Sequence, residues 1–204
     1  MNTTPTGLVA ILRGLTPGEA PEIGETLHAA GFRSLEIPLN SPLPFESIER
    51  LRSLLPPDCS VGAGTVLTPE DVERAKDAGS DIIVSPNTNV DVIKRSVALE
   101  MRSYPGVATP TEAFTAIDAG ATSLKLFPAD AVGIPGMKAW RAVLPSHIEL
   151  LPVGGVDESN LAAWIAGGAG GAGIGGTLYK PGHSPAEVGT RARKLMSVWQ
   201  RTAN

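Results

Sequence analysis

The chain has 204 residues, which is enough for one domain with a sizeable core. Its hydrophobic content of 42% is ordinary for a globular protein, and its net charge of −4 comes without any block of like charge, so nucleic acid and membrane are unfavoured partners. Cys59 is the only cysteine, and neither a signal-peptide pattern nor an apolar run of membrane-spanning length is visible, so we expect a cytoplasmic protein without a disulfide.

One unit recurs along the chain: a helical stretch, a small pair that ends in glycine, and a short apolar strand. A glycine that follows the last turn is a typical helix stop, and it occurs in the pairs Ala30-Gly31, Ala78-Gly79 and Ala119-Gly120. A threonine or serine before proline is a typical helix start, and it occurs at Thr16-Pro17, Thr68-Pro69, Thr109-Pro110 and Ser184-Pro185. In chain order, these signals predict strands near 7–13, 34–39, 60–66, 81–86, 102–108, 123–128, 149–155 and 171–176, and helices near 17–30, 44–54, 69–78, 89–99, 110–119, 136–143, 157–166 and 185–200.

Short apolar strands that alternate with helices are typical of a parallel sheet covered by helices. Eight such units over residues 1–204 predict one domain with the α/β fold of a single (β/α)8 TIM barrel. The alternative is an open doubly wound sheet, but Arg13-Gly14-Leu15 follows the first strand where a dinucleotide-binding sheet would have its glycine-rich turn. We therefore favour the barrel, whose active site would lie at the carboxyl ends of the strands.

Two ionisable residues, Glu36 and Lys125, fall inside apolar strands. Their large neighbours should face the helices, so alternation directs both side chains toward the barrel interior. Burial lowers the pKa of a lysine, and a neutral lysine is a nucleophile toward carbonyl groups. The alternatives are a lysine that reaches solvent at the strand end, or a structural ion pair; buried ion pairs contribute little net stability, so we favour the catalytic interpretation.

Glycine pairs end the last two predicted strands, Gly154-Gly155 and Gly175-Gly176. Barrel enzymes often bind phosphate in these two loops through backbone N–H groups, although such glycines can also serve only a tight turn. The hydroxyl of Thr65 lies beside small residues and could contact a ligand, or the residue could serve only in a turn. The guanidinium of Arg13 could bind a carboxylate or a phosphate, or it could be a solvated side chain. The histidines at 28, 147 and 183 have no metal-ligand spacing, so we expect no metal site.

With these residues assembled, the chain resembles the KDPG/KHG class I aldolase family from Leu8 to Tyr179. The matching runs are Val9–Gly14, the Glu36 strand, Gly62–Val66, Ser85–Asn87, Pro105–Glu112, Lys125–Pro128 and Val153–Val156. Within the family, Glu36–Ser41 is similar to the branch that acts on 2-dehydro-3-deoxy-6-phosphogalactonate. The phosphogluconate branch typically has threonine in place of Pro38 and arginine in place of Asn40, which makes Arg13 the candidate for the pyruvyl carboxylate.

The resemblance implies a (β/α)8 barrel, a homotrimer, no cofactor and no metal. It implies that Lys125 forms a Schiff base with the keto group and that Glu36 carries protons. Thr65 and Arg13 would hold the substrate, a phosphorylated keto acid, and Gly154, Gly155, Gly175 and Gly176 would hold its phosphate. The products would be pyruvate and D-glyceraldehyde 3-phosphate. The alternatives are a phosphogluconate aldolase of the same family, a phosphosugar isomerase or synthase, and a phosphosugar-binding barrel.

Overall fold

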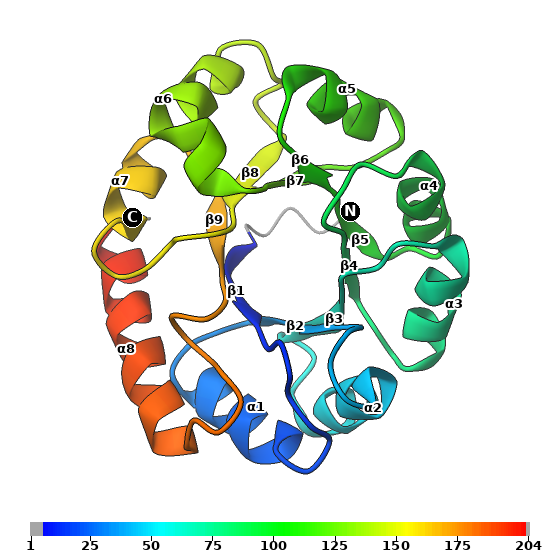
Figure 1. Ribbon diagram of the computed structural model, residues 1–204, viewed down its shortest axis with the longest axis vertical. Helices are drawn as coiled ribbons and strands as arrows, with labels where there is room; N and C mark the ends of the chain where they lie inside the picture. Colours follow the sequence, from blue (N-terminus) through cyan, green and yellow to red (C-terminus); the bar gives the residue numbers. More distant parts are fainter. Residues whose placement is uncertain (1–5, 203–204) are drawn as a thin grey trace.

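Parallel strands surround a central space, and helices cover them from the outside, in a computed structural model that describes residues 6–202 (Figure 1). The strands are β1 Gly7–Ile11, β2 Ser34–Pro38, β3 Ser60–Gly64, β4 Ile82–Val84, β5 Arg102–Tyr104, β6 Gly106–Val107, β7 Ser123–Leu126, β8 Glu149–Pro152 and β9 Gly171–Ile174. The helices are α1 Ala20–Ala29, α2 Pro44–Leu54, α3 Pro69–Asp77, α4 Val90–Ala98, α5 Pro110–Asp118, α6 Ala129–Arg141, α7 Leu161–Ala166 and α8 Pro185–Thr202.

The strand pairing fits the (β/α)8 barrel that the sequence predicts. One sheet has the order β5-β4-β3-β2-β1-β9 and the other β6-β7-β8, and all their pairs are parallel. A parallel bridge from Val153 to Gly173 links β8 with β9. The predicted strand 102–108 is split into β5 and β6 at Pro105, which has no N–H to donate, yet its carbonyl accepts the N–H of Lys125 at 2.9 Å.

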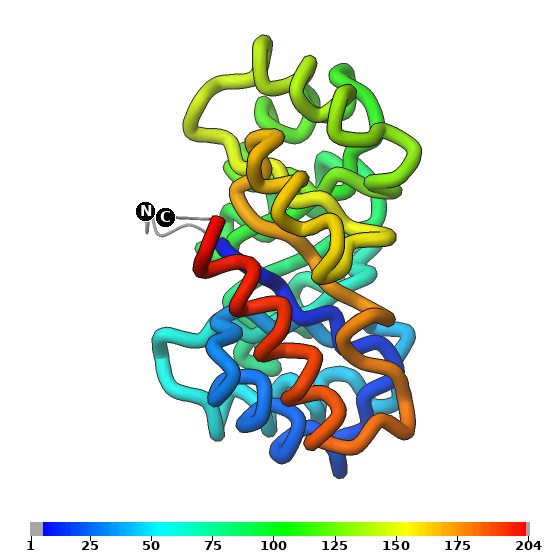
Figure 2. Tube along the Cα trace, turned by 90° about the vertical axis from the view of Figure 1, so that its left-hand side faces the viewer, coloured from blue at the N-terminus to red at the C-terminus, as the bar shows by residue number. Residues whose placement is uncertain are grey.

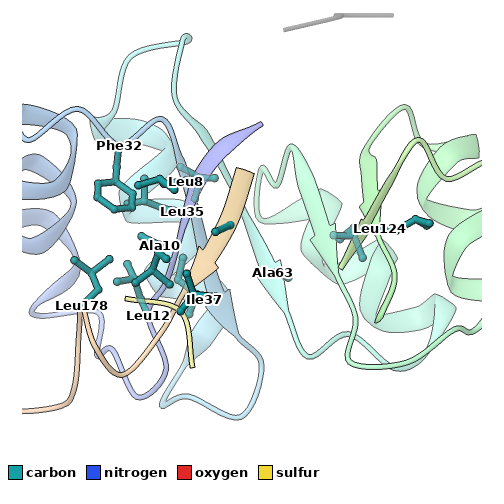
Figure 3. Close-up of a cluster of buried hydrophobic side chains, with 14 of the residues drawn as sticks. Leu8, Ala10, Leu12, Phe32, Leu35, Ile37, Ala63, Leu124 and Leu178 are labelled. Atoms are coloured by element: carbon teal, nitrogen blue, oxygen red, sulfur yellow. The ribbon is translucent and has the colours of Figure 1, made fainter. Parts of the chain in front are cut away.

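Alternation along the strands divides the buried side chains between two clusters. Leu35 and Ile37 of β2, Leu124 of β7 and their equivalents in other strands pack against the helices (Figure 3). A smaller cluster lies inside the barrel and contains Val9, Ile82, Val84, Tyr104 and Leu151. The inner face therefore receives every second residue of a strand, and this face includes Glu36 and Lys125.

The helix starts confirm part of the prediction and correct another part. The starts at Thr68 and Thr109 are confirmed, since both threonines accept a backbone N–H at the helix N-terminus. The start of α1 at residue 17 was wrong by three residues: the Glu19 carboxylate accepts bonds from the N–H and hydroxyl of Thr16, and the helix begins at Ala20. Helix α6 begins earlier than predicted and is kinked at Gly133, where φ is 68°.

Helix α8 completes the outer layer. It packs against both α1 and α7, the first and the last of the preceding helices, and against β1. Figure 2 shows this helix, in red, running beside the blue beginning of the chain. Within residues 6–202, no helix has the length and apolar character to cross a membrane.

A polar network covers the end of the barrel where the strands begin. The Glu149 Oε2 accepts hydrogen bonds from Thr6 Oγ1 at 2.6 Å, Ser123 Oγ at 2.8 Å and Arg102 Nη2 at 3.1 Å. Thr6 Oγ1 also lies 3.1 Å from the hydroxyl of Tyr104, which lies on the inner face. These contacts tie the starts of β1, β5, β7 and β8 together at this end of the barrel.

Candidate active site

Glu36 and Lys125 lie on the wall of one cavity inside the barrel. The remaining residues of this wall are Val9, Ile11, Val84, Tyr104, Leu151, Val153 and Gly173, most of them apolar. Glu36 is 2% exposed and Lys125 is 7% exposed, so water hardly reaches either side chain. Two ionisable groups thus share a space from which water is nearly excluded. Burial of an unpaired charge in such a space destabilises the folded state, so a functional role would explain the arrangement.

Burial is the largest influence on Lys125 and lowers the pKa of its amine below the ordinary value. The Glu36 carboxylate opposes this change and raises the pKa, while the guanidinium of Arg13 lowers it further. The Nζ atom lies 4.8 Å from the ring centroid of Phe127, a half-exposed residue directly after β7, and an aromatic face favours the ammonium form. Because burial is the first of these influences, the neutral amine becomes more accessible at physiological pH.

Burial acts on Glu36 in the opposite direction and raises the pKa of its carboxyl group, and the positive charges of Lys125 and Arg13 oppose that rise. Its Oε2 atom is buried and has no hydrogen-bond partner within residues 6–202. A buried polar atom of this kind is costly to leave unpaired. The two groups thus line one cavity and influence each other's pKa, and burial favours the neutral form of both.

Arg13 lies at the carboxyl end of β1, with an exposed side chain. Its Nη1 donates a hydrogen bond of 2.5 Å to the amide oxygen of Asn40, in the loop after β2. The backbone N–H of Gly14 donates to Ser41 Oγ in the same loop, at 2.9 Å. The bond to Asn40 orients the guanidinium at the barrel mouth, where its charge influences the pKa of both buried groups.

Thr65 follows β3 directly and has a φ of 57°. A left-handed backbone is unusual for a β-branched residue, and such strain concentrates at functional sites. The residue is half-buried, and it directly follows Gly64, which lies against the Glu36 side chain. The hydroxyl of Thr65 is thus carried at the same end of the barrel as Arg13.

The two glycine pairs also end neighbouring strands at this mouth. Gly154 and Gly155 have φ of 106° and 69°, so their loop needs glycine. The Thr177 hydroxyl, directly after Gly176, donates to the carbonyl of Val156 at 3.1 Å and joins the two loops. Gly176 and Thr177 border a surface hollow whose other wall residues include Lys180, His183 and Arg191.

No group of three or more histidine, cysteine, aspartate or glutamate side chains in the described part of the chain could hold a metal ion. His183 accepts the backbone N–H of Lys180 at Nδ1, at 3.0 Å, and lies 2.6 Å from an Arg191 nitrogen.

Cys59 is buried and its pKa is raised to about 11, mainly by burial, so its thiol is protonated.

Comparison with known proteins identifies the family. The family model described as "KDPG and KHG aldolase" matches residues 3–186. The chain belongs to this aldolase family.

Two curated members are 2-dehydro-3-deoxy-6-phosphogalactonate aldolases by name. The probable aldolase of Rhizobium meliloti (strain 1021) is 50% identical over 192 residues, which cover 94% of this chain and 91% of the relative. That of Escherichia coli (strain K12) is 45% identical over 194 residues, which cover 95% and 94%. A solved structure named "Native KDPGal structure" superposes with a TM-score of 0.95 at 44% identity, over 98% of this chain and 97% of the other.

Against this family background, the structure brings Glu36 and Lys125 to one cavity and places Arg13, Thr65 and the four glycines at the strand ends. Sequence reasoning did not anticipate Lys180 and Arg191 beside Gly176, nor Tyr104 on the cavity wall. Lys180 follows Gly176 by four residues, a spacing that could have drawn attention to it. The sequence indicated the position of Tyr104 less clearly, since only its place in the predicted strand 102–108 pointed to the barrel.

Proposed function

We propose that this chain is a Schiff-base aldolase that cleaves 2-dehydro-3-deoxy-6-phosphogalactonate to pyruvate and D-glyceraldehyde 3-phosphate. The observation that carries the proposal is the burial of Lys125 and Glu36 on the wall of one largely apolar cavity. The names of the two relatives support the choice of substrate.

Lys125 begins the reaction as a neutral amine. It attacks C2 of the keto acid, and the resulting carbinolamine loses water to give an iminium. Loss of the C4 hydroxyl proton then breaks the C3–C4 bond, and the electron pair moves to the iminium nitrogen. D-Glyceraldehyde 3-phosphate leaves as the aldehyde, and the enamine that remains is protonated at C3 and hydrolysed to pyruvate and free Lys125.

Glu36 carries protons through these steps, either directly or by way of a water molecule. Carbinolamine dehydration and enamine protonation need an acid, and removal of the C4 hydroxyl proton needs a base. The burial that raises the pKa of Glu36 brings it nearer to neutral pH, where one group can serve in both roles. Its unpaired Oε2 is available to a substrate proton.

Arg13 and Thr65 hold the pyruvyl end of the substrate in this proposal. A guanidinium binds a carboxylate through two parallel hydrogen bonds, and Arg13 is already oriented by Asn40. Thr65 would donate its hydroxyl from the strained end of β3. Val153, on the cavity wall, is our candidate for the residue that contacts C4 and distinguishes the galactonate from the gluconate epimer.

Gly154, Gly155, Gly175 and Gly176 form the phosphate cradle in the proposal, through backbone N–H groups that a side chain would keep from the anion. Lys180 supports this cradle, because a Cβ atom built on Gly176 would lie 3.4 Å from Lys180 Cε. Its ammonium group is therefore near the phosphate that the cradle would hold. Anchoring the remote end of the substrate positions the C3–C4 bond over the catalytic pair.

Our proposal extends to a cytoplasmic homotrimer. Exposed apolar side chains support self-association, since Leu43 is 66% exposed and borders a surface hollow together with Phe45. Light scattering of the purified protein would test the trimer, and a monomer at all concentrations would contradict it.

A coupled assay tests the activity. Lactate dehydrogenase and NADH report the pyruvate released from each of the two epimeric phosphorylated substrates. The proposal expects a higher kcat/KM for the galactonate epimer and loss of cleavage in Lys125→Ala. Preference for the gluconate epimer would overturn the choice of substrate, and cleavage by Lys125→Ala at an appreciable rate would overturn the Schiff base.

A further inference from the structure

In its carboxyl-terminal half, strand β3 presents only glycines to the barrel interior. Val61 and Ala63 belong to the outer core cluster, so alternation places Gly62 and Gly64 on the inner face. The side chain of Glu36, from the neighbouring strand β2, lies over the end of β3. The inner face of β3 therefore has room for the carboxylate.

The two glycines serve different purposes. A Cβ built on Gly62 would overlap the backbone carbonyl of Ile82, so this glycine allows two strands to approach. A Cβ built on Gly64 would overlap Oε2 of Glu36 and lie 2.7 Å from Cδ and 3.2 Å from Oε1. All three of the atoms nearest to it thus belong to the Glu36 carboxylate. Gly64 is not one of the positive-φ residues, so its backbone does not itself demand glycine.

No hydrogen bond to residues 6–202 holds the Oε2 atom of this carboxylate in place. The Oε2 atom that would collide with a residue-64 side chain is the atom without a hydrogen-bond partner in residues 6–202. Glu36 is 2% exposed, so protein atoms enclose its side chain almost completely. Packing against the surrounding atoms then sets the position of the proton-carrying oxygen. The backbone of Gly64, which has no side chain, is part of this packing.

We infer that Gly64 is a positioning residue for catalysis: it fixes the place of the Glu36 carboxylate against the end of β3. The inference rests on the proposed function, because it assigns Glu36 the proton transfers. A methyl group at position 64 requires a separation of about 3.4 Å from the carboxylate oxygens, so Glu36 would have to turn away by an ångström or more. Misplacement on this scale costs on the order of 10²-fold in rate.

The test compares Gly64→Ala with wild type, with Glu36→Asp and with the double variant. Gly64→Ala should lower kcat for cleavage by about 10- to 100-fold, with KM for the phosphorylated substrate within about threefold, since Arg13 and the proposed phosphate cradle follow other strands. It should still form the Lys125 adduct with pyruvate that borohydride traps. Gly18→Ala is the matched control, because its Cβ would have only one atom, 4.0 Å away, in the vicinity.

The Glu36→Asp background separates positioning from general damage. Aspartate is one methylene shorter, and its carboxylate withdraws from β3 and leaves room for a methyl group. Gly64→Ala should therefore change kcat by less than about threefold in this background. The difference between this effect and the effect of Gly64→Ala in wild type measures the coupling between residues 36 and 64. Thermal unfolding of each variant identifies any variant that fails to fold, and the double variant should then recover the folded state.

Two results would overturn the inference. One is a Gly64→Ala variant with the wild-type kcat, and the other is the same loss of kcat from Gly64→Ala in both backgrounds. Failure of the proposed function has a different signature, since wild type itself would then release no pyruvate and trap no adduct.

Discussion

Replacement of Glu36 by glutamine removes the proton carrier and preserves the shape of the buried side chain. Glutamine keeps the length of glutamate and still fits beside Gly64, because its amide has the same planar outline. The amide neither donates nor accepts a proton in catalysis near neutral pH. The change thus isolates acid–base chemistry from packing.

General acid–base catalysis gives the size of the rate effect, and the structure gives the sign of the pKa change. Positioned acid–base groups contribute about 10²- to 10⁴-fold, so kcat should fall by that factor, equivalent to about 2.7–5.4 kcal/mol of activation free energy. The Glu36 charge raises the pKa of Lys125, against burial and Arg13. Its loss should lower that pKa further, so the pH at which half of the amine is free to react with pyruvate should move to lower values.

Two measurements check this prediction. Pyruvate release by the coupled assay gives kcat, and the initial rate of borohydride-trapped adduct as a function of pH gives the titration of Lys125. Glu49→Gln, on the exposed side of α2, is the matched control. The reasoning would be refuted by a Glu36→Gln enzyme that cleaves substrate within about threefold of wild type, or by a midpoint that moves to higher pH.

Further predictions concern stability, phosphate binding and metal. Because burial raises the pKa of Glu36, the folded state binds its proton more tightly than the unfolded chain does, so the free energy of unfolding should fall as pH rises from the ordinary carboxyl pKa to the raised one. Urea unfolding of Glu36→Gln should lack this part of the pH dependence, and an unchanged slope would contradict the prediction. Leu35→Ala should lower the free energy of unfolding by about 2–5 kcal/mol, because Leu35 is 0% exposed, whereas Leu54→Ala, at 41% exposed, should change it far less. Lys180→Met should raise KM for the phosphorylated substrate about two- to fivefold and leave exchange of the pyruvate methyl protons unchanged; an equal effect on both would place Lys180 outside the phosphate subsite. EDTA should leave cleavage unchanged, since the iminium supplies the electron sink, and lost activity that zinc or magnesium restores would contradict this mechanism.

The fold was largely predictable because its signals are local. Each helix start and stop is encoded within a few residues, as at Thr68 before α3 and at Gly79 after it, where φ is 87°. A side-chain hydrogen bond that competes with these signals explains the late start of α1. The sequence at Thr16-Pro17 has the form of a helix start, but the Glu19 side chain caps a turn there and delays α1.

The candidate site was predictable where an ionisable residue interrupts an apolar strand. Glu36 and Lys125 are conspicuous for that reason, and alternation alone directs them inward. The role of Gly64 was not predictable, because it depends on which atom of another strand occupies the space of a missing side chain. The same holds for the bond from Arg13 to Asn40, which joins residues 27 positions apart.

The most direct test of the central claim is to treat the enzyme with pyruvate and borohydride and to locate the adduct by peptide mass spectrometry. We predict a reduced pyruvyl group on Lys125 in wild type, none on the exposed Lys180 or Lys138, and no adduct in Lys125→Ala. An adduct on another lysine, or full cleavage activity without any trapped adduct, would contradict the account.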